Sequence, residues 1–209
     1  MLSPLPYIHG LALAIGLIIA VGPKDAFVIR QSLMGRHLGV MLVICVASDI
    51  ALITLGMLGM GTLLSSSYWL MVVTLAGGSF YMCWHGVTAL RSAISKTSMP
   101  TLGASQYESF FQVARATAVL SFLNPLAILD SAVVIGAVGG AKRPEDQVSF
   151  ALGAVSASLI WFSILIGGCR IVAPLFRRPG MWRALDVAIA VIMFAMAATT
   201  VQSALSIPA

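Results

Sequence analysis

The sequence predicts an all-α, polytopic membrane protein with about six transmembrane helices, and three observations predict it. Apolar stretches long enough to cross a bilayer take up most of the 209 residues. Only 9% of the residues are charged and the mean hydropathy is +1.00, whereas soluble domains carry about a quarter charged residues. A bilayer core about 30 Å thick needs roughly 20 apolar residues of helix, and six segments reach that length.

The six predicted spans follow one another in a single transmembrane domain, residues 1–209. They cover residues 5–30, 38–63, 68–90, 113–138, 148–168 and 182–205. Gly22 and Pro23 interrupt the first span near its end, and Asn124 and Pro125 interrupt the fourth in its middle. The polar segment 91–112 is rich in turn-forming residues and is expected to be a cytoplasmic linker. It would separate two inverted three-helix repeats, which cover residues 5–90 and 113–205.

The distribution of positive charge predicts the orientation. Cationic residues gather in the loops after the first, third and fifth spans: Arg30, Arg36, His37, Arg91, Lys96, Arg115, Arg170, Arg177, Arg178 and Arg183. The turn after the second span has no charge, and in the turn after the fourth Lys142 and Arg143 stand beside Glu145 and Asp146. Because cytoplasmic loops collect Lys and Arg, both termini are expected outside the cytoplasm. If the first span fails to cross fully, the N-terminus is cytoplasmic and five spans cross.

The same charge pattern bears on the partners. The net charge of +5 does not indicate nucleic acid, because the basic residues sit in short loops and not on one face. The expected partners are the lipid bilayer and a small-molecule substrate, and a homo-oligomer is compatible with the sequence. Three cysteines inside apolar spans argue against disulfides. His9 and His85 lack the spacing of a metal site, so neither a metal nor another cofactor is expected.

The two proline pairs indicate a cavity shared by the two repeats. A proline removes a helical hydrogen bond and frees a carbonyl, which in lipid persists only where protein or a water-filled cavity satisfies it. Pro23 and Pro125 are compatible with ordinary kinks, but each has an acid nearby, Asp25 or Asp130. Interrupted helices at matching positions of two inverted halves are a sequence pointer to a transporter's binding site.

Asp49 and Asp130 are the strongest candidate substrate residues. Each is a carboxylate inside an apolar span, where an ionised acid costs about 2.5–3.5 kcal/mol on insertion scales. Such a group needs a partner, a proton or a ligand, and for Asp49 a structural pairing with another span is the plainer alternative. Two carboxylates in one cavity would attract a cation, and proton exchange on them would couple to transport.

Other conspicuous residues have simpler interpretations. Arg30 and Arg36 are expected to anchor the chain at the membrane interface and not to bind substrate. Trp69, Trp161 and Trp182 are expected to be interface or packing residues. Two sets of glycines are expected to allow close helix packing: Gly56, Gly59 and Gly61, and Gly136, Gly139 and Gly140.

Two motifs resemble the signatures of a known family. Residues 22–31, Gly-Pro-Lys-Asp-Ala-Phe-Val-Ile-Arg-Gln, resemble the first signature of the LysE/ArgO family of basic amino-acid exporters. Residues 122–125, Phe-Leu-Asn-Pro, with Asp130 five residues past the proline, resemble the second. The spans around Asp49 and Trp161 also fit, so the likeness covers nearly the whole chain. The related homoserine/threonine exporters usually have a lysine after that proline and no acid there.

The resemblance implies an exporter of lysine or arginine in the cytoplasmic (inner) membrane, with Asp49 and Asp130 as its matched acids. The chain departs from the family pattern at Lys24 and Asp25, where a glutamine-asparagine pair is common. The added cation and anion would either pair with each other or change the ligand.

The expected function is therefore export of a basic amino acid by antiport with protons. The residues expected to form the site are Asp49, Asp130, Asn124, Pro125, Gly22, Pro23, Asp25 and Lys24. The alternative is export of neutral amino acids or related small metabolites, with Lys24 and Asp25 as a neutralised structural pair. An intramembrane aspartyl protease also needs two buried acids, but the residues before Asp49 and Asp130 do not match its glycine-x-glycine-aspartate motif, so no enzymatic activity is expected.

Overall fold

The structure, a computed structural model, is all-helical, and its described residues contain no strand. It describes residues 3–18, 22–35, 37–60, 68–94, 109–122, 124 and 127–205, so the predicted site residue Pro125 lies outside the described residues. The helical elements are α1 (Pro4–Ile18), α2 (Pro23–Met34), α3 (Leu38–Leu55), η1 (Gly56–Met60), α5 (Tyr68–Ile94), α6 (Phe110–Phe122), η2 (Ile128–Ile135), α8 (Gly136–Gly140), α9 (Pro144–Val172), η3 (Ala173–Arg177) and α10 (Pro179–Leu205). The predicted fold class, all-α, is confirmed.

Several helices have the length and composition of membrane spans. Among the described residues three helical stretches qualify alone: Leu38–Gly59, Pro144–Phe176 and Gly180–Gln202. Helices α1 and α2 qualify only as a pair, and they are inclined at 80° to each other. With 15 and 12 residues they are about 22 and 18 Å long, which is less than a bilayer core of about 30 Å. The chain is a multi-pass membrane protein.

The first proline starts a helix. Pro23 occupies the first turn of α2, where its fixed φ and missing N–H carry no cost. The Asp25 carboxylate accepts a hydrogen bond from the Gly22 N–H at 2.8 Å, which satisfies a free donor at this helix end. At the other end Gly35 adopts a left-handed conformation with φ +77°, and its N–H bonds to the Gln31 carbonyl.

The second interruption leads into an unusual helix. Helix α6 ends at Phe122, and η2 begins at Ile128, whose N–H donates to the Asn124 carbonyl at 3.1 Å. Over its eight residues η2 is a π-helix, with Asp130 in its first turn. π-Helical turns are rare and occur frequently at functional sites. The second predicted acid therefore sits on locally widened backbone.

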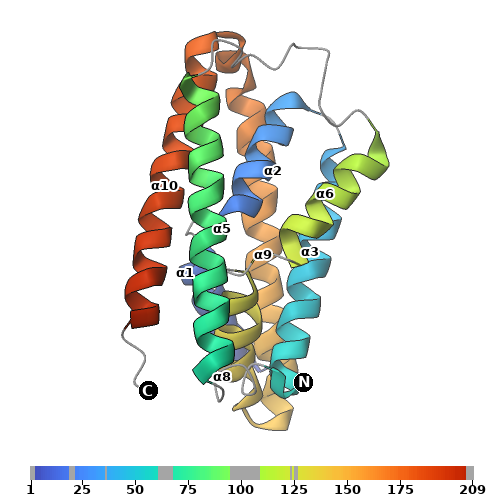
Figure 1. The fold of residues 1–209 in the computed structure, drawn as a ribbon. Coiled ribbons are helices and arrows are strands. Elements are labelled where there is room, and N and C mark those ends of the chain that lie inside the picture. Colours follow the sequence, from blue (N-terminus) through green and yellow to red (C-terminus); the bar gives the residue numbers. More distant parts are fainter. Residues whose placement is uncertain are drawn as a thin grey trace.

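The helices of the two halves pack on each other reciprocally (Figure 1). α1 and α2 lie along α9, α6 and η2 lie along α3, and α5 lies along α10. The Ser3 N–H donates to Ser149 Oγ at 2.9 Å, near the start of α9. Val28 of α2 packs on Phe162 and Ile166, further along the same helix. α1 begins and α10 ends at the same end of the bundle (Figure 1).

Glycines allow the closest contacts between helices. A Cβ on Gly10 of α1 would lie 2.0 Å from the Phe150 carbonyl oxygen of α9. A Cβ on Gly136 would lie 2.4 Å from the Cα of Gly56, where α8 crosses η1. Real Cβ atoms do not approach so closely, so only glycine fits at these two positions. The predicted close packing at Gly56 and Gly136 is confirmed.

We expect Gly10→Ala to destabilise the protein, because the added methyl group would collide with backbone that cannot rotate away. Overpacking of this kind costs roughly 1–3 kcal/mol. Gly16→Ala is the matched control on the same helix, since a Cβ there meets nothing within 4 Å. Thermal unfolding of the two purified variants in detergent measures the difference. Equal Tm values would show that α1 and α9 do not approach as described.

Candidate functional site

Most of the predicted site residues surround one central cavity. The cavity has a volume of about 50 Å³ and is lined by Leu17, Ile18, Gly22, Lys24, Asp25, Asp49, Asn124, Ala127, Asp130, Ser131 and Phe162. The structure thus brings together the predicted residues Gly22, Lys24, Asp25, Asp49, Asn124 and Asp130. Pro23 lines a neighbouring cavity, which is described below.

An ion pair between Lys24 and Asp49 joins α2 to α3 inside the bundle. The Lys24 Nζ lies 2.7 Å from Asp49 Oδ1, and the two residues are 5% and 4% exposed. The same ammonium is within hydrogen-bonding distance of the Cys45 carbonyl at 3.4 Å and of Ser48 Oγ at 3.5 Å. It also lies 4.6 Å from the centre of the Phe162 ring, a distance suited to a cation–π contact. Each buried charge therefore has a partner, which buried charges require.

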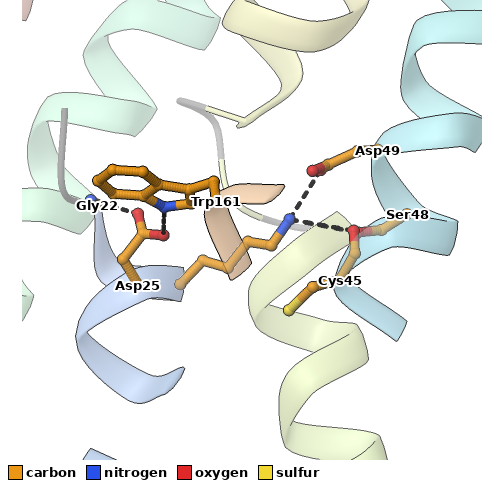
Figure 2. Close-up of polar contacts among 7 residues, drawn as sticks. Gly22, Asp25, Cys45, Ser48, Asp49 and Trp161 are labelled. Atoms are coloured by element: carbon orange, nitrogen blue, oxygen red, sulfur yellow. Dashed lines mark hydrogen bonds and ion pairs between the residues drawn. The ribbon is translucent and has the colours of Figure 1, made fainter. Parts of the chain in front are cut away.

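Asp25 forms hydrogen bonds with residues other than Lys24 and Asp49 (Figure 2). Its carboxylate accepts hydrogen bonds from the Gly22 N–H at 2.8 Å and from the Trp161 indole N–H at 3.1 Å. Lys24 and Asp25 are adjacent in sequence, yet each pairs with another part of the chain. The expectation of a mutual structural pair is therefore wrong, and Trp161 does more than pack. The Gly22 N–H at this break is satisfied by Asp25.

Asp130 is the acid of the cavity whose carboxylate oxygens have no partner among the described residues. It lines the cavity from η2, whereas Asp49 lines it from α3. Within the part of the chain that the structure describes, its carboxylate forms neither a hydrogen bond nor an ion pair. Its oxygens are therefore free to accept hydrogen bonds from a positively charged ligand in the cavity.

The charges around the cavity are unequal. One ammonium, Lys24, faces the three carboxylates of Asp25, Asp49 and Asp130, so ionised groups leave an excess of two negative charges. A glutamine-asparagine pair at positions 24 and 25, common in the resembling family, would leave the same excess. The departure from the family pattern therefore rearranges the charge of the cavity without changing its sum.

A second charged cluster was not anticipated from the sequence. The Arg30 guanidinium lies 3.5 Å from Asp186 Oδ1 and 3.3 Å from Ser92 Oγ. The Ser92 hydroxyl donates to Asp186 Oδ2 at 2.6 Å. Arg30 thus contacts an acid inside the bundle, and its role as an interface anchor stays a prediction. Asp186 could have been found as another lone acid in an apolar span, but it lies near Arg183 at the predicted cytoplasmic end.

A multi-pass helical bundle around a charged cavity has the architecture of a membrane transport protein. The model of the LysE type translocator family matches residues 15–203, so the chain belongs to that family and is a transporter, not an enzyme. Arginine exporter proteins ArgO of Salmonella schwarzengrund, Salmonella enteritidis PT4 and Salmonella typhi are each 31% identical over 191 residues, which is 91% of this chain and 90% of each relative. No solved structure matches the chain.

The central ion pair leads to a stability prediction. Lys24→Gln leaves the Asp49 carboxylate buried without a cation, and Asp49→Asn leaves the ammonium without an anion. Removing one partner of a buried pair costs about 3–5 kcal/mol, whereas removing both is often nearly neutral. We therefore expect each single variant to unfold at a lower temperature than the double variant.

The exposed pair formed by Arg143 and Glu145 supplies the control, since its atoms are 3.9 Å apart and its side chains are 82% and 74% exposed. Arg143→Gln and Glu145→Gln should change stability by less than about 1 kcal/mol. Thermal unfolding in detergent measures all five variants. A double variant of Lys24 and Asp49 that is no more stable than the singles would contradict the pairing.

Proposed function

We propose that this transporter exports a basic amino acid, with L-arginine as the first candidate, from the cytoplasm across the cytoplasmic membrane. The observation that carries the proposal is that three carboxylates and one ammonium line the central cavity, where the Asp130 carboxylate has no partner among the described residues. A substrate with two cationic groups and one carboxylate complements this charge. The relatives that align along most of the chain are named as arginine exporters, which supports the same substrate class.

The proposed architecture has six crossings in two inverted repeats, residues 5–90 and 113–205, with 91–112 as a cytoplasmic linker. In each repeat an interrupted first span packs on the middle span of the other repeat, and the third spans pack together. Such reciprocal packing is expected for two halves related by an axis in the membrane plane. α5, with 27 residues, has the length for one further crossing, and α6 followed by η2 and α8 for another.

The size of the cavity indicates that transport requires a structural change. About 50 Å³ holds only a few water molecules, at roughly 10–15 Å³ each. Small-molecule sites usually have about 300–1,000 Å³, so a bound amino acid would need the first turns of α2 and η2 to separate. We propose that the substrate cation binds Asp130 and competes with Lys24 for Asp49, and that a proton replaces it on Asp130 after release.

One observation favours the alternative substrate class, neutral amino acids or related small metabolites. Lys24 already neutralises Asp49, one of the two acids matched to the family. If the pair never opens, only Asp130 remains for a ligand, and a substrate with a single ammonium group suffices. The two candidates therefore differ in whether the Lys24–Asp49 pair opens during transport.

We expect Asp130→Asn to abolish export of basic amino acids, because the amide keeps the size of the side chain but removes its charge. Asp146→Asn, in the first turn of α9, is the control and should export normally. Efflux of labelled L-arginine, L-lysine and L-threonine from loaded cells, divided by the amount of protein in the membrane, measures the effect. Parental arginine export by Asp130→Asn would refute the charge-based mechanism, and efflux of threonine alone would support the neutral alternative.

We also expect both termini to face away from the cytoplasm. Helices α2, α5 and α9 end at the opposite end of the bundle from the start of α1 (Figure 1), and Arg91 and Arg170 lie in the last turns of α5 and α9. Reporter fusions at residue 1 and after Ala209, active only on one side of the membrane, measure this. An N-terminus in the cytoplasm would replace the six-crossing arrangement with five crossings.

A further inference from the structure

A second and much larger cavity lies on the other side of α2. Its volume is about 420 Å³, within the range of small-molecule sites. It is lined by Pro23, Ala26, Phe27, Arg30, His85, Thr88, Ala89, Ala116, Val119, Leu120, Asp186 and Ile189. Most of this lining is apolar, and Arg30 and Asp186 supply its two opposite charges.

The charged pair in this cavity is loosely made. Arg30 and Asp186 meet through a single contact of 3.5 Å, without the two parallel hydrogen bonds that this type of pair forms at its best. Asp186 is fully buried, and its Oδ1 accepts no hydrogen bond from the described residues. The Arg30 side chain is 38% exposed and covers that oxygen. A buried acceptor without a donor costs stability, so a ligand that supplies a donor would be favoured here.

The start of α2 borders both cavities. Pro23 lines the larger cavity, whereas its neighbours Gly22, Lys24 and Asp25 line the central one. Ser92 lies in the last turn of α5, beside Arg91, and Asp186 lies in the second turn of α10. The larger cavity therefore belongs to the half of the bundle that the proposed topology places toward the cytoplasm.

We propose that the Arg30–Asp186 cavity is a cytoplasmic binding site for the α-amino and α-carboxylate groups of the amino acid, occupied before the substrate reaches the central cavity. The inference rests on the function proposed above and adds a second site to it. The substrate carboxylate binds the Arg30 guanidinium and draws it away from Asp186. The uncovered Oδ1 then accepts hydrogen bonds from the α-ammonium group.

The charges of this site match that part of the substrate. One guanidinium and one carboxylate sum to zero, as do the α-carboxylate and α-ammonium groups of an amino acid. Binding replaces one loose intramolecular ion pair by two intermolecular pairs, so no charge is left unpaired. The negative excess of the central cavity instead suits the cationic side chain, so the two sites would bind different ends of the substrate.

Equilibrium binding to purified protein tests the second site by itself. The Asp130→Asn variant is the parent protein, because it lacks the charge with which the central cavity is proposed to bind the substrate. The protein is held in nanodiscs of phosphatidylcholine. The probes are labelled L-arginine, agmatine, which lacks the carboxylate, and Nα-acetyl-L-arginine, whose α-nitrogen carries no charge. We expect the parent to bind L-arginine about tenfold or more tighter than either analogue, as loss of one hydrogen bond to a charged group implies.

Substitutions of Arg30 and of Asp186 should then change the preference for L-arginine over different analogues. Adding Arg30→Gln should weaken L-arginine about tenfold and leave agmatine unchanged, whereas Asp186→Asn should abolish the preference over the acetylated analogue. Arg30→Lys, which keeps the charge, should retain the preference over agmatine. Arg91→Gln, an exposed change in the last turn of α5, is the control and should alter nothing. A merely structural role would lower binding of every probe equally.

The outcomes distinguish this site from the proposed function. If wild-type protein exports arginine but the Asp130→Asn parent binds none, or if Arg30→Gln and Asp186→Asn keep both preferences, the second site is wrong and the exporter stands. If wild-type protein neither binds nor exports arginine, the proposed function itself fails. Loss of L-arginine binding on changing the nanodisc lipid to phosphatidylethanolamine, with export unaffected, would assign the cavity to a lipid head group and overturn the inference.

Discussion

The buried ion pair between Lys24 and Asp49 is the interaction on which the rest of the site depends. Taking a single charge into a membrane bundle costs several kcal/mol, so neither group would remain ionised there alone. The pair ties the first turn of α2 to the middle of α3 with a 2.7 Å contact. This contact fixes which way the turn faces. Asp25 then meets the Trp161 indole, and Pro23 faces the larger cavity.

A backbone constraint explains why the cavity lies where it does. Helices as short as α1 and α2 cannot cross a bilayer core alone, and their ends carry polar groups that lipid cannot satisfy. At the first break Asp25 satisfies the Gly22 N–H, and at the second the Asn124 carbonyl accepts from Ile128. Both breaks line one cavity, and the glycine contact between η1 and α8 lets the halves approach closely beside it. The polar interior is thus a consequence of interrupting the two spans.

The sequence predicted the helices and the members of the central site better than it predicted their partners. Hydropathy locates helices because lipid admits little else, and lone polar residues in apolar spans must turn inward. The partner of Lys24 was not predictable, since the choice between Asp25 and Asp49 depends on how two helices are rotated about their axes. The contact of Arg30 with Asp186 was not predicted, because the two residues are far apart in sequence and only the fold brings them to 3.5 Å. The π-helix at Asp130 likewise has no local signature.

The resident lysine also bears on how protons enter the proposed cycle. With a neutral pair at positions 24 and 25, an emptied cavity would leave Asp49 and Asp130 without counter-charges, and each would need a proton to remain buried. Lys24 already neutralises Asp49, but Asp25 adds a third carboxylate, so Asp25 and Asp130 are the two groups without a counter-charge when the substrate has left. A basic substrate that displaces Lys24 exchanges one monovalent cation for another at Asp49, and the ammonium then lies free beside Asp25 and Asp130. In the proposed cycle, therefore, Lys24 and Asp25 change which carboxylates can take up a proton, from Asp49 and Asp130 to Asp25 and Asp130, and leave their number unchanged.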